Sequence, residues 1–404
     1  MELLYIYFLF FLLFFLFVKQ KKDKVAFLIM LLLYLLGSIA AILVYDKLYK
    51  GYILSVEAIL FHISMIFLLL YPLQEFDSVS KNSIERSDYK LVRGFSIFVI
   101  FICLLKISTD IPNINISVMF SDVSFLRNAL EEGAFRESNV IIRYLNFFAG
   151  QYWSVALVLA FYFMLHYPSK RLIIIFLLIS SLGIIISGFR VAAREYLVKY
   201  VFILFILTYW FSDKINKHWK HFLKKTGILL GGVFCFFFLL ITFLRFGNSS
   251  RFDSPVTSML SYLGQGFIHF SSYFNEFSEG VTGGAIRFPF FAGKSMSAYN
   301  ISEHIYTNAD LNVFSTTIGS WIFELGIVWT VIITFLHNYI FKRVGKSQMT
   351  IYKLIYIIWI YDFIFSALFF YNEVLNTSRI ASILLIVFLD YISNKKYSKN
   401  IISS

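Results

Sequence analysis

The chain has 404 residues, of which 59% are hydrophobic and 15% charged, with a mean hydropathy of +0.73 and a formal net charge of +12. Soluble domains average roughly 45–50% apolar and about 25% charged residues. This composition excludes a disordered chain, a collagen-like fibre and a disulfide-stapled secreted domain. The apolar runs are continuous rather than alternating, so we expect an all-α polytopic membrane protein and not a β-barrel.

Eleven apolar segments are close to the length that a helix needs to cross a membrane. No predicted inner loop exceeds about 20 residues, so we predict a single membrane domain over residues 1–404 without a cytosolic catalytic domain. The predicted spans are residues 3–18, 25–44, 52–72, 91–107, 144–165, 172–187, 196–211, 227–244, 313–341, 351–370 and 374–391.

Lysine clusters set the predicted orientation, because basic loops tend to stay cytoplasmic. The cluster at residues 19–24 directly follows the first span, and alternation from there places the N-terminus outside and the C-terminus inside. The lysine clusters at residues 214–225, 342–353 and 395–399 then all fall inside.

Arginine shows the opposite distribution, since nine of 13 arginines fall on the predicted outer side while 18 of 23 lysines fall inside. Arginine binds phosphate and carboxylate groups through two parallel hydrogen bonds. For any single arginine, pairing with an outer acidic residue or a lipid phosphate is the simpler explanation. The outer arginines are Arg127, Arg136, Arg143, Arg190, Arg194, Arg245, Arg251, Arg287 and Arg379.

Two outer loops are longer than a hairpin, residues 108–143 and 245–312. In the first we expect a surface helix from Ser121 to Glu132. In the second, Ser254 is a predicted N-cap before a proline, and an amphipathic helix is expected to run to Gly280. Loops of this length are usually functional. The apolar positions of the second helix are Val256, Leu260, Leu263, Phe267, Phe270, Phe274 and Phe277.

The outer turn at residues 187–195 contains the sharpest polar motif. Arg190 and Arg194 are four residues apart, so on a helical turn both guanidinium groups would share one face. Glu195 could orient one of them, and Gly188 would let the backbone leave the helix. This arrangement suits a pyrophosphate headgroup, although a hairpin with solvated charges is the simpler alternative.

Four ionisable residues fall inside predicted spans, where such groups are costly and often functional. They are Glu57, His62, Glu324 and Asp362. Glu324 would lie roughly 18 Å down a helix from Asn312. It could belong to a relay or transport path, or it could bond to a neighbouring helix. Gly227 and Gly231 predict a helix-packing contact.

Motifs for nucleotide or metal chemistry are missing from the sequence. There is no Walker loop, HExxH, CxxC, DxD or Gly-x-Ser-x-Gly pattern, and the Gly264-Gln265-Gly266 run lacks a third glycine. We therefore expect no metal site, no cofactor and no nucleotide-driven reaction.

The eleven spans, the Ser-Gly-Phe-Arg turn at residues 187–190 and a large outer loop before Glu324-Leu325-Gly326 resemble the Wzy-type family. These are the polymerases of O-antigen and capsule repeat units in bacterial inner membranes. The resemblance covers most of the chain through its architecture and a few positions. It implies a metal-independent membrane glycosyltransferase with a GT-C-like fold and its site on the outer, periplasmic side.

The resemblance also implies the reaction and the partners. The donor would be a glycan on undecaprenyl pyrophosphate, and the acceptor the terminal sugar of another lipid-linked repeat unit. Membrane lipids, a chain-length regulator and a flippase are the expected partners, with no nucleic acid. Outer arginines would hold the pyrophosphates and neutralise the leaving group. The expected substrate-binding residues are Arg190, Arg194, Arg245, Arg251, Arg287, Arg127, Arg143, Arg379 and Glu324.

A general base would assist attack by the sugar hydroxyl. His304 ranks first, and His269, Glu276 and Glu195 are further candidates. O-antigen ligases share this architecture, but they typically place a histidine about nine residues before the glutamate, where this chain has none. A lipid-linked oligosaccharide flippase is the alternative from another class. Transporters usually show internal repeats and interrupted spans, and the sequence has no repeat and only five prolines.

Overall fold

The structure is a computed structural model, and it describes twelve ranges of the chain. These are residues 1–19, 24–80, 84–114, 140–190, 195–246, 254–274, 279–280, 282–286, 288–293, 316–346, 349–368 and 377–402. Within them the chain is helical with connecting turns and contains no strand.

Six helices in the described part of the chain are long and apolar enough to cross a membrane. The structure thus confirms an all-α membrane protein, while the count of eleven spans and their orientation stay predictions. The six helices are Val25–Leu48, Val56–Phe76, Tyr89–Asn113, Phe148–His166, Arg171–Arg190 and Thr316–Lys346, and Leu4–Lys19 is a shorter apolar helix.

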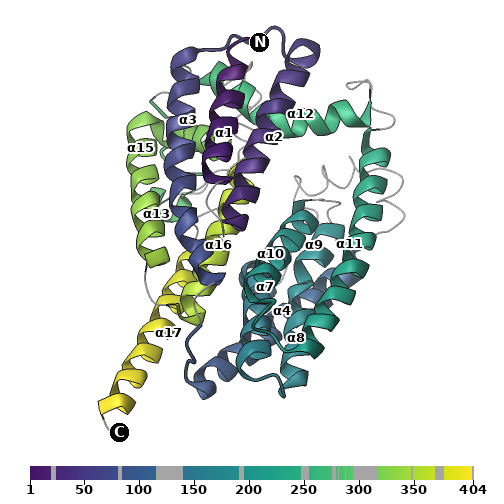
Figure 1. Ribbon diagram of the computed structural model, residues 1–404, viewed down its shortest axis with the longest axis vertical. Coiled ribbons are helices and arrows are strands. Elements are labelled where there is room, and N and C mark those ends of the chain that lie inside the picture. Colours follow the sequence, from purple (N-terminus) through teal and green to yellow (C-terminus); the bar gives the residue numbers. More distant parts are fainter. Residues whose placement is uncertain are drawn as a thin grey trace. The chain divides into compact units, whose positions relative to one another are not determined.

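The chain forms two compact units (Figure 1). The first contains α1 (Leu4–Lys19), α2 (Val25–Leu48), α3 (Val56–Leu70), most of the 3₁₀ helix η1 (Tyr71–Ser80), α12 (Pro255–Tyr273), α13 (Pro289–Ala292) and α15 (Thr316–Lys346). The second contains α4 (Tyr89–Asp110), η2 (Ile111–Asn113), α7 (Val140–His166), α8 (Arg171–Ser181), α9 (Gly183–Arg190), α10 (Glu195–Phe211) and α11 (Lys217–Phe246). Helices α16 (Ile351–Ala367) and α17 (Thr377–Ile402) each contribute to both.

In the first unit, α1, α2 and α3 pack alongside one another and α12 lies across α2 and α3 (Figure 1). Glycine residues on both helices allow the backbones of α2 and α12 to approach each other closely where they cross. A Cβ atom on Gly264 would lie 2.3 Å from the backbone nitrogen of Ala41, and one on Gly37 would lie 2.8 Å from the Phe267 ring. Small residues at a crossing let two helix backbones approach each other in this way.

Helix α12 begins where the sequence predicts. The Ser254 side chain accepts a hydrogen bond from the backbone N–H of Thr257 at 3.2 Å, and a proline occupies the first turn. The helix ends at Tyr273, however, and not at Gly280.

The predicted apolar face of α12 is only partly correct. Phe267 and Phe270 are buried, but Val256 is 65% exposed, while Ser258 and Ser261 are buried instead. The N-terminal half of α12 therefore packs through its small polar residues, because large side chains would not fit the close crossing with α2.

Helix α15 is interrupted at Gly326, which has φ 82° and ψ 173°. The Trp321 and His337 rings lie on opposite sides of this break, with their centroids 5.2 Å apart. In a straight α-helix, residues sixteen positions apart are separated by about 24 Å. The ten-residue half-helix before Gly326 therefore folds back along the helix that follows.

Helix α3 gives independent evidence for the fold-back. Thr316, the first residue of α15, hydrogen-bonds His62, and Asn338 hydrogen-bonds the carbonyl of Leu68. His62 and Leu68 are about 9 Å apart along α3, whereas a straight helix would separate Thr316 and Asn338 by about 33 Å. Glu324 lies in the half-helix before this break. Its predicted distance of roughly 18 Å from Asn312 stays a prediction, because Asn312 lies outside the described residues.

In the second unit, α7 packs against α4, α8 and α10, and α9 packs against α4 and α10. Residues 155–163 of α7 are fully buried, which explains an unbroken apolar sequence without a polar face. The predicted span over residues 172–187 is two helices, α8 and α9, separated at Leu182.

Two glycine predictions are wrong. Gly188 lies inside α9 and does not end that helix. Gly227 and Gly231 mark no close helix crossing within the part of the chain that the structure describes, because a Cβ atom on either would meet nothing there within 4 Å.

Candidate functional site

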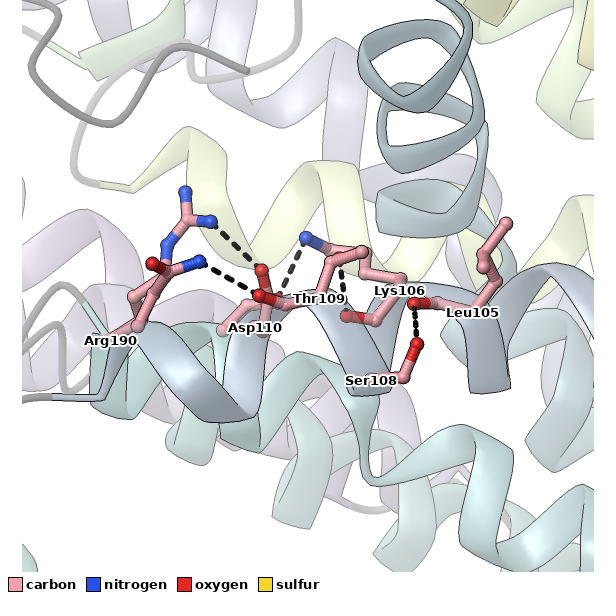
Figure 2. Close-up of polar contacts among 8 residues, drawn as sticks. Leu105, Lys106, Ser108, Thr109, Asp110 and Arg190 are labelled. Carbon is pink, nitrogen blue, oxygen red and sulfur yellow. Dashed lines mark hydrogen bonds and ion pairs between the residues drawn. The ribbon is translucent and has the colours of Figure 1, made fainter. Parts of the chain in front are cut away.

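The candidate site in the second unit is built around the end of α4. Side chains in the last turns donate additional hydrogen bonds to carbonyls of the preceding turn: Ser108 to Leu105 at 2.7 Å and Thr109 to Lys106 at 2.8 Å (Figure 2). The carbonyl of Thr109, at the helix end, accepts from Asn113 Nδ2 at 2.8 Å, as unpaired helix-end carbonyls require. The α-helix ends at Asp110, and the short helix η2, which contains a proline, follows directly.

Asp110 is fully buried and binds three donors. Its Oδ1 accepts from Arg190 Nη1 at 2.9 Å, and its Oδ2 accepts from Ser187 Oγ at 2.6 Å. Lys106, one turn earlier on α4, forms an ion pair with Oδ2 at 2.8 Å. Figure 2 shows Arg190 and Lys106 on opposite sides of the carboxylate. The buried charge of Asp110 is thus compensated, as the cost of desolvating a carboxylate requires.

Within the described part of the chain, the charged residues of the cluster are Arg190, Lys106 and Asp110, and they sum to one positive charge. The side chains of Arg190 and Lys106 are 16% and 14% exposed, so water screens their charge less than at an open surface. A partly desolvated guanidinium held in one orientation is suited to bind a phosphate-type anion.

The predicted motif at residues 187–195 is partly seen. Arg190 and Ser187 share one face of α9 toward Asp110, while Arg194 lies outside the described residues. Glu195 forms an ion pair with Lys199 at 2.7 Å in the first turn of α10. The arginine is oriented by Asp110, a residue that the sequence analysis did not select.

Glu324 is the second feature with functional potential, and it lies in the first unit. It is 2% exposed, and its Oε2 accepts a hydrogen bond from the backbone N–H of Ile286 at 3.2 Å. Gly280, with φ 81°, packs on the break in α15: a Cβ atom there would lie 2.6 Å from the nitrogen of Gly326. The fold-back of α15 thus places Glu324 against a segment of the second predicted outer loop.

His62 connects three helices at the centre of the first unit. Its ring nitrogens lie 2.8 Å from Tyr7 Oη on α1 and 2.8 Å from Thr316 Oγ1 on α15. Its ring stacks on Phe270 of α12 with the centroids 3.9 Å apart. Thr316 has a φ of 66°, which is unusual for a β-branched residue, so the contact with His62 helps to hold a strained helix start.

His269 is 3% exposed. The rings of Tyr49 and Tyr52 meet it edge-on with centroids 5.2 and 5.0 Å away. This packing gives the predicted base little access to a sugar hydroxyl.

The remaining predicted residues are dispersed along the chain. Arg143 lies on α7, Arg245 on α11 and Arg379 at the start of α17, where Arg379 is 8% exposed. Glu57 lies in the first turn of α3, and its side chain is exposed rather than packed against other helices. Arg127, Arg194, Arg251, Arg287, Glu276, His304 and the expected helix from Ser121 to Glu132 lie outside the described residues.

Lys106 and Asp110 are not among the predicted site residues, although the sequence contains a signal for them. Lys106 lies at the end of a predicted span and Asp110 follows one turn later, which is the spacing of a helical ion pair. Comparisons with protein-family models, with curated proteins and with solved structures found no match to this chain.

Proposed function

We propose that the protein is a Wzy-type polymerase of lipid-linked oligosaccharide repeat units, with eleven membrane spans and a GT-C-like fold. The reaction transfers a growing glycan from undecaprenyl pyrophosphate to the terminal sugar of another lipid-linked unit at the outer face of the inner membrane. The observation that carries the proposal is Arg190, held by buried Asp110 in a cluster with one excess positive charge.

The chemistry of glycosyl transfer explains why such a group is useful. When the anomeric C–O bond breaks, the electron pair stays on the leaving pyrophosphate. A guanidinium group that is already oriented stabilises this charge without reorganising at the moment of reaction. Arg190 is assigned to this role, and the other arginines of the predicted outer face are assigned to binding the two lipid-linked substrates.

The testing experiment compares the surface glycan of a deletion strain with that of its parent. Polymerase function predicts loss of the chain-length ladder while single repeat units still reach the surface. If polymer accumulates on the carrier lipid without reaching its final anchor, the protein is a ligase instead.

A lipid-linked oligosaccharide flippase is the second candidate, and one observation favours it. Transporters often build their sites at interrupted helices, and α15 is interrupted at Gly326 beside buried Glu324. In that case the deletion strain would trap single units on the cytoplasmic side of the membrane.

A further inference from the structure

We infer that Asp110 is a positioning residue that orients the Arg190 guanidinium for the leaving pyrophosphate, and that Lys106 keeps the cluster positively charged. This inference rests on the proposed function and assigns roles to two residues at the same site. Asp110 itself does not touch the reacting atoms, because it is fully buried and bound by three donors.

The geometry ties Arg190 to the framework of the second unit. Ser187 and Arg190 are three residues apart on α9, so both side chains reach the same carboxylate on α4. The two bonds end on different oxygens of Asp110. They therefore restrict both the position of α9 and the direction of the guanidinium group.

Helix α9 needs this restraint. It has only eight residues, from Gly183 to Arg190, and it is separated from α8 at Leu182. A helix this short depends on its tertiary contacts, and α9 packs against α4 and α10. The contact with Asp110 adds a restraint at its terminal arginine.

The charges explain why the cluster contains Lys106. An arginine–aspartate pair alone is neutral and would attract a pyrophosphate only weakly. Lys106 approaches Oδ2 of the same carboxylate at 2.8 Å and restores one positive charge. The division of roles follows: Lys106 contributes to attraction of the anion, and Asp110 to the orientation of Arg190.

The test uses the full-length protein reconstituted in lipid vesicles with lipid-linked repeat units, and measures kcat and KM per folded molecule. Lys106→Met keeps the Asp110–Arg190 pair but removes the excess charge, so KM should rise, and this variant is the reference for kcat. The double variant Lys106→Met/Asp110→Asn restores the net charge of +1 but removes the carboxylate. Its kcat should fall about tenfold or more, since a reacting geometry displaced by about 1 Å can cost 10²-fold.

This pair of variants separates positioning from folding and from charge. A purely structural role for Asp110 predicts less folded protein from the double variant with an unchanged kcat per folded molecule, and that result would overturn the inference. If Asp110 is replaced by Glu instead of Asn in the double variant, part of the lost kcat should return, because a carboxylate is again present at the site.

The proposed function can fail separately. If wild-type protein in these vesicles binds undecaprenyl pyrophosphate but forms no polymer, the polymerase proposal and the role of Asp110 in that reaction both fall. If the wild type polymerises and the double variant has the same kcat as Lys106→Met, the inference alone is wrong.

Discussion

The crossing of α2 and α12 offers a sharp test of the packing in the first unit, through the substitution Gly264→Ala. The added Cβ atom would lie 2.3 Å from the backbone nitrogen of Ala41, 2.5 Å from its Cα and 2.6 Å from the carbonyl carbon of Ala40. All three neighbours are backbone atoms. No side chain can rotate away to make room, so the two helices must separate.

The size of the effect follows from the displacement. Normal contact requires the helices to move apart by about 1 Å, because protein interiors have no spare volume. A gap of 0.5–1 Å forfeits roughly a quarter to a half of the dispersion energy between facing atoms. Overpacking of this kind costs about 1–3 kcal/mol. The better helix propensity of alanine returns at most about 1 kcal/mol. Taking the middle of the overpacking range, about 2 kcal/mol, the expected net loss is about 1–2 kcal/mol.

The assay is unfolding in mixed micelles by titration with a denaturing detergent, followed by tryptophan fluorescence. Gly94→Ala on α4 is the matched control, because a Cβ atom there would meet nothing within 4 Å. Gly94→Ala should be neutral or slightly stabilising, whereas Gly264→Ala should unfold at a lower detergent fraction. Equal midpoints for the two variants would show that the close crossing of α2 and α12 does not exist.

Three further predictions concern the fold-back and the proposed reaction. In an otherwise cysteine-free chain, cysteines replacing Trp321 and His337 should be joined by a short bifunctional reagent, whereas a straight helix would hold them about 24 Å apart and give no cross-link. Gly280→Ala should destabilise the protein more than Gly283→Ala in the same unfolding assay: both residues have positive φ, but only Gly280 packs against backbone. Arg190→Ala should abolish the polymer ladder while single units remain on the carrier lipid, and Arg190→Lys should be partly impaired because it loses the bidentate fork. A normal ladder from Arg190→Ala would contradict its assignment to the pyrophosphate.

The sequence predicted the features that depend on local patterns. Long apolar runs coincide with helices, and the Ser254 cap begins α12 as expected. Hydrophobicity and capping act over a few residues, so both can be recognised without knowledge of the fold. The apolar face of α12 was predicted less well, because its neighbour α2 is more than 200 residues away in the chain and presents the small residues Gly37, Ala40 and Ala41 at the crossing.

The arginine site also combines a feature that the local sequence predicted with one that depends on a distant segment. The pattern of arginines selected Arg190 and suggested that Glu195 could orient either Arg190 or Arg194. In the structure, the residue that binds Arg190 is Asp110, eighty positions earlier in the chain. An ion pair between distant segments leaves no local signal. The pair of Lys106 and Asp110 did leave one, since it has helical spacing, but a loop was expected to begin at residue 108.

The break in α15 could not be predicted, and it changes how the two proposed functions compare. Glycine is frequent in membrane helices, so Glu324-Leu325-Gly326 resembles an ordinary helical stretch. The fold-back requires Gly280 to pack on Gly326 and the half-helix to be buried in protein, where irregular backbone is tolerated. A transporter was disfavoured because the sequence has no internal repeat and few prolines that could interrupt a span. The break at Gly326 removes the second reason, and the first one remains. The polymerase proposal then depends on the Arg190 cluster, and the side of the membrane on which single units accumulate decides between the two.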